Sequence, residues 1–277
     1  MGLACKSLVL PAEMRATFGD AAAFERIMAL EGDVFRDVRG RRTLRFELQG
    51  RSYFAKLHYG VGWGEILKNL MTLRLPIVSA ATEWRAIHRL NEIGIRTTPA
   101  VAYGCEGVSP AALRSFIITE DLGDIVSLET LCADWAQHPP EARFKRRLIV
   151  AVAELARKLH DNGLNHRDFY LCHLCLDQPL LRQGQIRLYL IDLHRVGIRA
   201  RIRSGDRMKD IAALYFSAMD CGLGSRDILR FIRHYRPQGL RKSWLGERPF
   251  WRAVGVRAQA LYDKFQRHRQ RAKIQPG

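Results

Sequence analysis

Two acidic residues, each next to a strongly patterned segment, constrain the fold of this chain more than any other feature. Apolar residues recur at helical spacing through residues 144–162 and Gly163 follows as a left-handed stop, so Asp168 is expected on a loop directly after a buried helix. The apolar run 186–191 predicts a strand, and Asp192 lies at its exit. The chain therefore places two carboxylates at the ends of two buried elements.

The acidic residue of the loop closes a His-Arg-Asp triplet, and Asp192 follows 24 positions later. Phosphoryl transfer from ATP needs such an arrangement, because one carboxylate orients the attacking hydroxyl while another holds the magnesium ion that bridges the phosphate oxygens. The triplet alone arises by chance in a chain rich in Arg and Asp, but the order of helix, loop, hairpin and strand is typical of protein-kinase-like folds. We therefore predict that His166, Arg167 and Asp168 form the catalytic loop. Asp192 is predicted as the metal ligand.

Asp210, near the start of a strongly apolar helix predicted over residues 209–219, allows two interpretations. A carboxylate in the first turn of a helix is commonly only a partner of the helix dipole. In kinase-like folds, a carboxylate at this place accepts hydrogen bonds from the backbone of the catalytic loop.

Lys56 interrupts an otherwise apolar predicted strand. A lone Lys there is usually an edge residue whose stem covers apolar surface. The functional alternative is a cation on the ATP phosphates, held by a carboxylate from a nearby helix. Glu83 shares one face of the helix predicted over residues 81–93 with Ile87 and Leu90, and leaving an inward Glu unpaired costs on the order of several kcal/mol. We therefore expect Lys56 and Glu83 to form a pair.

The first part of the chain predicts a small antiparallel sheet, and the rest is mainly helical. Strands are expected over residues 34–38, 43–48, 53–57, 100–103 and 115–119. Residues 120–123 then break the pattern, as a hinge between lobes would, and the backbone of Glu120 and Leu122 is where an adenine ring would bind. We therefore predict an α+β, bilobal, protein-kinase-like fold, with residues 1–120 as the sheet lobe and 121–277 as the helical lobe.

Two loops of the first lobe have no single interpretation. The basic turn 39–42 lies where kinase-like folds cover the nucleotide phosphates, and Arg41 can contact phosphate in place of the backbone amides of a Gly-rich loop. A solvated basic turn explains the same residues. The loop 60–64 carries three glycines and is equally consistent with a lid or lipid-facing element and with a plain insertion.

The charge of the chain points to a polyanionic partner, since 45 Lys and Arg residues against 28 Asp and Glu residues leave a net charge of +17. Sequence patterns of nucleic-acid-binding modules are absent, so no nucleic acid is expected. An anionic membrane surface and an acidic substrate are the more favoured polyanionic partners. The basic run 198–209 follows Asp192, where kinase-like folds present the acceptor, so it favours an acidic acceptor.

Location and redox state follow from what the sequence lacks. No apolar run approaches the ~20 residues that span a bilayer, and the first residues do not match a secretion signal, so a cytoplasmic location is expected. The 6 cysteines are scattered and predict no disulfide framework. Cys172 and Cys175 have a metal-like spacing, but a second pair for a closed zinc site is missing, which favours reduced thiols.

Several short motifs together resemble the lipopolysaccharide core heptose(I) kinases of Gram-negative bacteria. They lie at residues 62–66, 68–70, 165–168, 172–173, 191–195 and 209–210, and the resemblance runs from about Val34 to Tyr262. It implies an ATP- and magnesium-dependent kinase that phosphorylates the 4-hydroxyl of the first inner-core heptose on the cytoplasmic face of the inner membrane. It also implies association with acyl carrier protein, an acidic partner.

The resemblance also implies roles by position. Asp168 would be the catalytic carboxylate and Asp192 the metal ligand. Lys56 would be the phosphate-binding lysine, with Glu83 as its partner. His173 lies five positions after Asp168, where protein kinases have a magnesium-binding Asn. Imidazole is a poor magnesium ligand compared with oxygen, so a second metal site stays open and contact of His173 with phosphate or substrate is the alternative.

Two other functions remain open. A small-molecule kinase of the antibiotic-phosphotransferase type would use the same carboxylates but needs an acidic pocket for cationic substrates, which the basic run 198–209 opposes. A basic pseudokinase that binds membrane or nucleic acid would tolerate changes at Lys56, Asp168 and Asp192.

Overall fold

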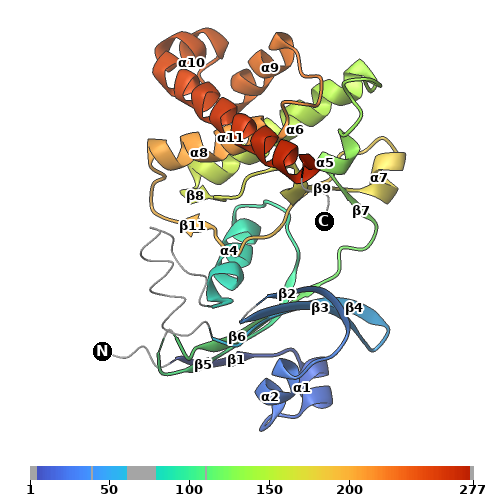
Figure 1. Cartoon of the computed structure of the whole chain (residues 1–277). Coiled ribbons are helices and arrows are strands. Elements are labelled where there is room, and N and C mark those ends of the chain that lie inside the picture. Colours follow the sequence, from blue (N-terminus) through green and yellow to red (C-terminus); the bar gives the residue numbers. More distant parts are fainter. Residues whose placement is uncertain (1–4, 39, 61–78, 110, 275–277) are drawn as a thin grey trace. The chain divides into compact units, whose positions relative to one another are not determined.

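The computed structural model describes residues 5–38, 40–60, 79–109 and 111–274, which form two compact units (Figure 1). The first unit comprises Met1–Glu92, Thr97–Gly123 and Asp192–Arg195, and the second comprises Ile93–Arg96, Asp124–Ile191 and Val196–Gly277. The sequence predicts one boundary between the lobes, after residue 120. In the structure, two short segments cross between the units: residues 93–96 belong to the second unit and residues 192–195 to the first. The second of these segments matters, because it brings Asp192 into the unit that holds Lys56.

The first unit is built on one antiparallel sheet of six strands, in the order β1-β5-β6-β4-β3-β2. Its elements are β1 (Cys5–Val9), α1 (Ala12–Phe18), α2 (Ala23–Met28), β2 (Asp33–Val38), β3 (Arg41–Leu48), β4 (Arg51–His58), α4 (Ala81–Glu92), β5 (Ala100–Gly107) and β6 (Arg114–Glu120). All five predicted strands are confirmed, as is the helix that carries Glu83.

The two faces of this sheet have different chemistry because side chains alternate along each strand. Tyr53, Ala55 and Leu57 of β4 are buried in an apolar core with α1 and α2. Lys56 therefore points to the opposite face, where α4 packs against β5 and β6. One apolar face stabilises the unit, and the other carries the charged residues.

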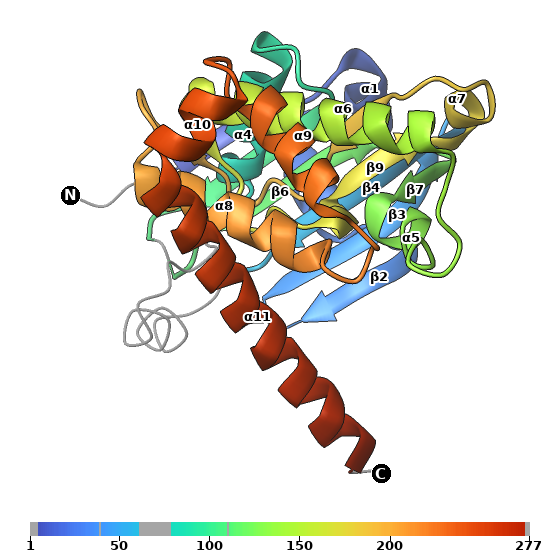
Figure 2. The ribbon, with the colours of Figure 1, turned by 90° about the horizontal axis from the view of Figure 1, so that it is seen from above.

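The second unit is mainly helical. Its elements are β7 (Ile125–Ser127), α5 (Leu128–Leu131), α6 (Ala142–Asp161), β8 (Leu164–Asn165), the 3-10 turn η1 (Leu171–His173), β9 (Leu174–Asp177), α7 (Gln178–Arg182), β10 (Leu188–Leu190), β11 (Gly197–Ile198), α8 (Ser204–Ser217), α9 (Ser225–Tyr235), α10 (Leu240–Gly246) and α11 (Arg248–Ile274). Helix α6 packs against α9 and α8 against α11, and the C-terminal part of α11 extends past the other helices of the unit (Figure 2). Among the helices of the described residues, none is long and apolar enough to cross a bilayer.

The loop that carries Asp168 begins where α6 ends. Gly163 has φ +79° and follows directly after the helix, as expected. Its neighbour β8 pairs with β11, and the Arg199 N–H donates to the Gly163 carbonyl oxygen at 3.0 Å. A Cβ at Gly163 would lie 1.9 Å from the Arg199 carbonyl oxygen, so only glycine fits here.

Four expectations need correction or fall outside the described residues. Residues 20–31, with Asp20 as a cap and Gly32 as a stop, predict one short helix, but the structure has the shorter α2 there and a separate helix α1 before it. The strand predicted over 186–191 forms a ladder only at β10, and α8 begins at Ser204, before the predicted start. The loop 60–64 lies mostly outside the described residues.

The cysteine pattern was also misleading for one pair. Cys5 and Cys105 form a disulfide, although the sequence predicted no disulfide framework. The reason is the pairing of β1 with β5, which places Ser7 opposite Cys105 and so brings Cys5 within reach. Cys172 and Cys175 are free thiols, as expected.

The close approach at Gly163 generates a stability prediction. We expect Gly163→Ala to lower the free energy of unfolding by about 1–3 kcal/mol more than Gly184→Ala does. Gly184 also has positive φ, +74°, but a Cβ there would meet no atom of the described chain within 4 Å, so it controls for backbone strain alone. Urea unfolding measures both losses, and equal losses would contradict the steric explanation.

Candidate active site

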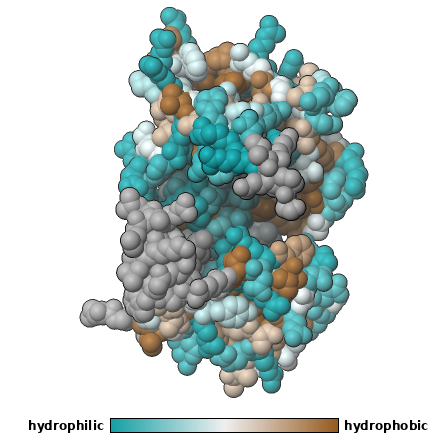
Figure 3. Space-filling model, in the orientation of Figure 1, coloured by the Kyte–Doolittle hydropathy of each residue, from teal (hydrophilic) through white to brown (hydrophobic). Residues whose placement is uncertain are grey.

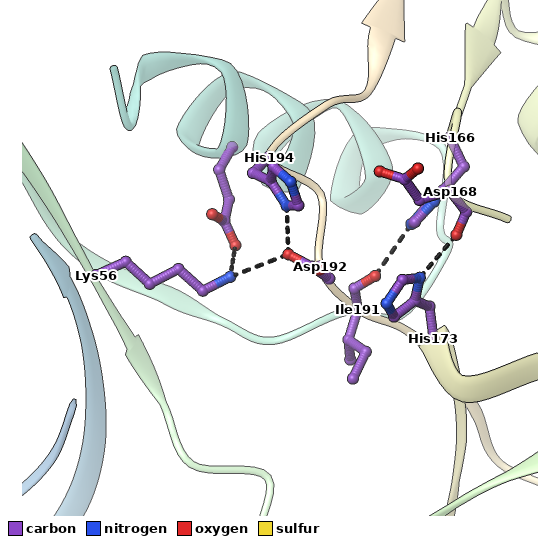
Figure 4. Close-up of polar contacts among 8 residues, drawn as sticks. Lys56, His166, Asp168, His173, Ile191, Asp192 and His194 are labelled. Carbon is purple, nitrogen blue, oxygen red and sulfur yellow. Dashed lines mark hydrogen bonds and ion pairs between the residues drawn. The ribbon is translucent and has the colours of Figure 1, made fainter. Parts of the chain in front are cut away.

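The first unit holds a buried ion pair on the charged side of its sheet. The Nζ of Lys56 on β4 lies 2.6 Å from Oε1 of Glu83 on α4, and these side chains are 18% and 3% exposed (Figure 4). The predicted pair is therefore present. Its near-complete burial is tolerable because each charge has an opposite charge at hydrogen-bond distance.

Asp192 joins this pair. Its Oδ1 lies 3.5 Å from the Lys56 Nζ and accepts a hydrogen bond from His194 Nδ1 (Figure 4). The backbone of Asp192 has φ +60°, which non-glycine residues rarely adopt, and such conformations concentrate at functional sites. The sequence indicated His194 only as part of a motif, and the structure adds it as the residue that orients the Asp192 carboxylate.

Two more basic residues lie on the same face. Arg41 on β3 is paired in register with His58 on β4, two residues after Lys56. Burial lowers the pKa of Arg41, while Glu83 and Asp192 favour its charged form. Burial, together with the positive charge of Arg41, lowers the pKa of His58 to about 3, so this imidazole is neutral near pH 7. The period of two along a strand, which links His58 to Lys56, was the sequence signal that could have revealed it.

The predicted adenine-binding stretch has most of its polar groups already in use. The Glu120 carboxylate binds Arg51 at 2.6 Å, and the Glu120 N–H donates to the Pro99 carbonyl oxygen at 2.9 Å. The next amide, that of Asp121, donates to the Ser52 carbonyl oxygen at 3.1 Å. The amides of Glu120 and Asp121 are therefore not free to donate to a base.

The predicted catalytic loop, residues 166–168, lies in the second unit and is held by Asp210. Its Oδ2 accepts a hydrogen bond from the His166 N–H at 2.6 Å, and its Oδ1 accepts one from the Arg167 N–H at 2.9 Å. Arg167 has φ +71° and Asp210 is 1% exposed. The structure thus selects the second interpretation of Asp210, because its carboxylate binds the loop backbone instead of the dipole of its own helix.

Two imidazoles fix the loop further. His166 is fully buried, and its Nε2–H donates to the carbonyl oxygen of Ile191, the residue that precedes Asp192, at 3.0 Å (Figure 4). The Nδ1–H of His173 donates to the Asp168 carbonyl oxygen at 2.7 Å. The His173 carbonyl oxygen in turn accepts from the Ile191 N–H at 3.0 Å. His166 and His173 therefore both link the loop to the backbone of Ile191.

The donor set can be tested against a magnesium ion. No group of three or more His, Cys, Asp or Glu residues in the described ranges is arranged to hold a metal. Magnesium does not require one, since it is commonly bound by one or two carboxylates together with substrate phosphates and water. The carboxylate of Asp192 fits that chemistry. The His173 ring does not, because it is a nitrogen donor already bonded to the loop backbone.

Comparisons with known proteins agree with one another. The family model described as "Lipopolysaccharide kinase (Kdo/WaaP) family" matches residues 25–235. The lipopolysaccharide core heptose(I) kinase WaaP of Escherichia coli K12 is 46% identical over 88% of this chain and 93% of its own length. The protein of the same name from Pseudomonas aeruginosa is 46% identical over 94% of this chain and 98% of its own length. A solved structure of "WaaP in complex with acyl carrier protein" has a TM-score of 0.80 at 41% identity, and the match covers 92% of this chain and 99% of that one.

Proposed function

The chain belongs to the lipopolysaccharide kinase (Kdo/WaaP) family, and on that premise we propose that it transfers the γ-phosphate of ATP to the 4-hydroxyl of the first heptose of the lipopolysaccharide inner core. The observation that carries the proposal is the buried Lys56–Glu83 pair with Asp192 beside it. A pseudokinase would have no need for this costly arrangement, and a drug-modifying kinase would not match these relatives over nearly their whole length.

The first unit would bind the nucleotide. Lys56 and Arg41 supply positive charge for the phosphates, and Glu83 keeps the Lys56 ammonium in position. The Leu122 backbone would meet the adenine. Asp192 would hold magnesium, which would supply positive charge against the negative charge that develops during transfer.

The second unit would bind and activate the acceptor. Asp168 orients the heptose hydroxyl and accepts its proton as the hydroxyl oxygen bonds to the γ-phosphorus and the bond from that phosphorus to the bridging oxygen of ADP breaks. Its backbone is fixed by His173, and the preceding residues are fixed by Asp210. Positioning of this kind supplies much of the rate enhancement in phosphoryl transfer, because the protein takes no covalent part in it.

The role of Asp168 gives the test of this proposal. We expect Asp168→Asn to lower kcat for ATP-dependent phosphorylation of unphosphorylated core oligosaccharide by roughly 10²–10⁴-fold, because a positioned proton acceptor is lost. The free energy of unfolding should stay unchanged. Asp134→Asn, which alters an exposed carboxylate of the same unit, is the matched control. A near-native rate for the Asp168 variant would exclude the assignment.

We also propose that the enzyme meets its glycolipid acceptor at an anionic membrane surface, on the cytoplasmic face of the inner membrane. Figure 3 shows hydrophilic residues over much of the visible surface of the helical unit. Helix α11 is strongly basic, and Asp263 is the only acidic residue between positions 248 and 271. Its exposed Arg and Lys residues, among the side chains that the structure describes, are Arg248, Arg252, Arg257, Lys264, Arg267, Arg269 and Arg271. Charge complementarity to anionic headgroups supports this partner.

Salt dependence tests the membrane proposal. Binding to vesicles that contain anionic phospholipid should weaken above ~0.3 M salt, since exposed charges are screened within a few Å to 10 Å. Replacing Arg267 and Arg271 by Gln should weaken binding roughly tenfold or more at low salt, at about 1 kcal/mol for each basic residue. The same change at Arg143 and Arg146, exposed on α6, should have little effect. Salt-independent sedimentation with vesicles would point to apolar insertion instead.

Acyl carrier protein is proposed as a further partner, because the related WaaP, 41% identical to this chain, has been solved in complex with it. The second unit contains an apolar cavity of about 330 Å³ among α5, α6, α8, α9 and α11. Trp135, Leu148, Val152, Phe231 and Trp251 contribute to its walls. An acyl chain is the part of such a partner that an apolar cavity fits.

Filling the cavity tests this partner. Ile149 lines the cavity, whereas its neighbour Val150 lies on another side of α6. Ile149→Trp should weaken binding of acylated acyl carrier protein by about tenfold, which corresponds to ~1.4 kcal/mol, and Val150→Trp should change it by less than about twofold. Isothermal titration calorimetry with the acylated and unacylated forms measures this. Equal affinity of both forms, unchanged by Ile149→Trp, would contradict the proposal.

A further inference from the structure

A buried chain of side chains connects the end of α9 to the catalytic loop within the second unit. The hydroxyl of Tyr235 lies 2.7 Å from Nδ1 of His160, and Nε2 of His160 lies 3.3 Å from Oδ2 of Asp210. All three residues are at most 1% exposed. Asp210 is the residue whose carboxylate holds the backbone of His166 and Arg167.

The direction of each hydrogen bond is fixed by chemistry. Burial lowers the pKa of His160, so its imidazole is neutral and carries one N–H. The Asp210 carboxylate can only accept, which requires the His160 proton to be on Nε2. Nδ1 then has only a lone pair, and the Tyr235 hydroxyl must donate to it. Burial raises the pKa of Tyr235, so the phenol keeps the proton that it donates.

We propose that Tyr235 is a positioning residue of the catalytic loop, which selects the His160 tautomer that completes the hydrogen bonding of Asp210. The hydroxyl acts through His160 and touches neither substrate nor nucleotide. This proposal rests on the proposed kinase function for its effect on rate, but not for its effect on the loop.

The tautomer matters because of what Asp210 does. In the other tautomer, the lone pair of Nε2 would face the carboxylate, and Asp210 would lose one of three hydrogen bonds while buried. A buried carboxylate that is not fully hydrogen-bonded costs free energy, and the hydrogen bonds by which Asp210 holds the loop backbone would weaken. These hydrogen bonds are needed because Arg167, next to Asp168, has a left-handed backbone conformation that costs free energy.

The ring of Tyr235 is held in place independently of its hydroxyl. It stacks on Phe231 with a centroid distance of 5.7 Å and meets Trp251 edge to face at 5.9 Å. Removal of the hydroxyl alone therefore leaves the packing of α9 and α11 intact. Tyr235→Phe thus isolates the hydrogen bond from the packing.

The first experiment compares Tyr235→Phe with Tyr262→Phe. The Tyr262 hydroxyl also hydrogen-bonds a side chain, donating to Oδ1 of Asp220 at 2.7 Å, but Asp220 does not bind the loop. We expect Tyr235→Phe to lower kcat about tenfold with KM for ATP changed less than about twofold, because one hydrogen bond that orders the loop is lost. Tyr262→Phe should change neither constant. Equal kcat values for Tyr235→Phe and the native enzyme would overturn the proposal.

A second variant distinguishes selection of the tautomer from general stabilisation. In His160→Gln, the side-chain amide can donate to Asp210 without help from Tyr235. Tyr235→Phe should then cost less than about twofold in kcat in this background, against about tenfold in the native one. The same loss in both backgrounds would show that the hydroxyl acts independently of His160, which contradicts the proposal.

Hydrogen exchange gives a readout that needs no activity. Exchange of the His166 and Arg167 amides should be about tenfold faster in Tyr235→Phe than in the native protein or in Tyr262→Phe. Unchanged exchange would overturn the proposal even where His160→Gln does not fold. Absence of ATP-dependent transfer by the native protein would instead refute the proposed function, and the exchange result would still stand on its own.

Discussion

The buried carboxylate of Asp210 is the constraint on which the catalytic loop depends. A charge that is 1% exposed is tolerable only when its oxygens are hydrogen-bonded, and here two of the donors are backbone amides of the loop. The cost of leaving this carboxylate unsatisfied therefore keeps the loop in one conformation, including the left-handed backbone of Arg167. His160 supplies the third hydrogen bond and links the arrangement to α9.

The same principle organises the first unit. Lys56 and Glu83 lie on the face of the sheet opposite its apolar core, and each offsets the cost of burying the other's charge. Asp192 approaches Lys56 from a short segment that returns from the second unit, so the peptide bond between Ile191 and Asp192 joins the two sets of residues covalently. His166 binds the carbonyl oxygen of Ile191, the last residue before the segment that carries Asp192.

Residues whose role follows from local periodicity could be predicted, and those whose partners are distant in sequence could not. The period of two placed Lys56 on one face of its strand, and the helical period placed Glu83 inward, so their pairing was foreseeable. His160 and Tyr235 are separated by 75 positions and Cys5 and Cys105 by 100, and no local pattern couples such pairs. His160 also lies at the end of an apolar helical face, where the sequence pattern predicts only a buried core residue.

A crystal structure of the chain with magnesium and a non-hydrolysable ATP analogue would test the central claim most directly. We predict that the Lys56 ammonium contacts the phosphates, that the Asp192 carboxylate binds the metal, and that the Asp168 carboxylate faces the terminal phosphate. A bound nucleotide with no metal on Asp192, or with the Asp168 carboxylate turned away from the γ-phosphate, would contradict the roles proposed for these residues.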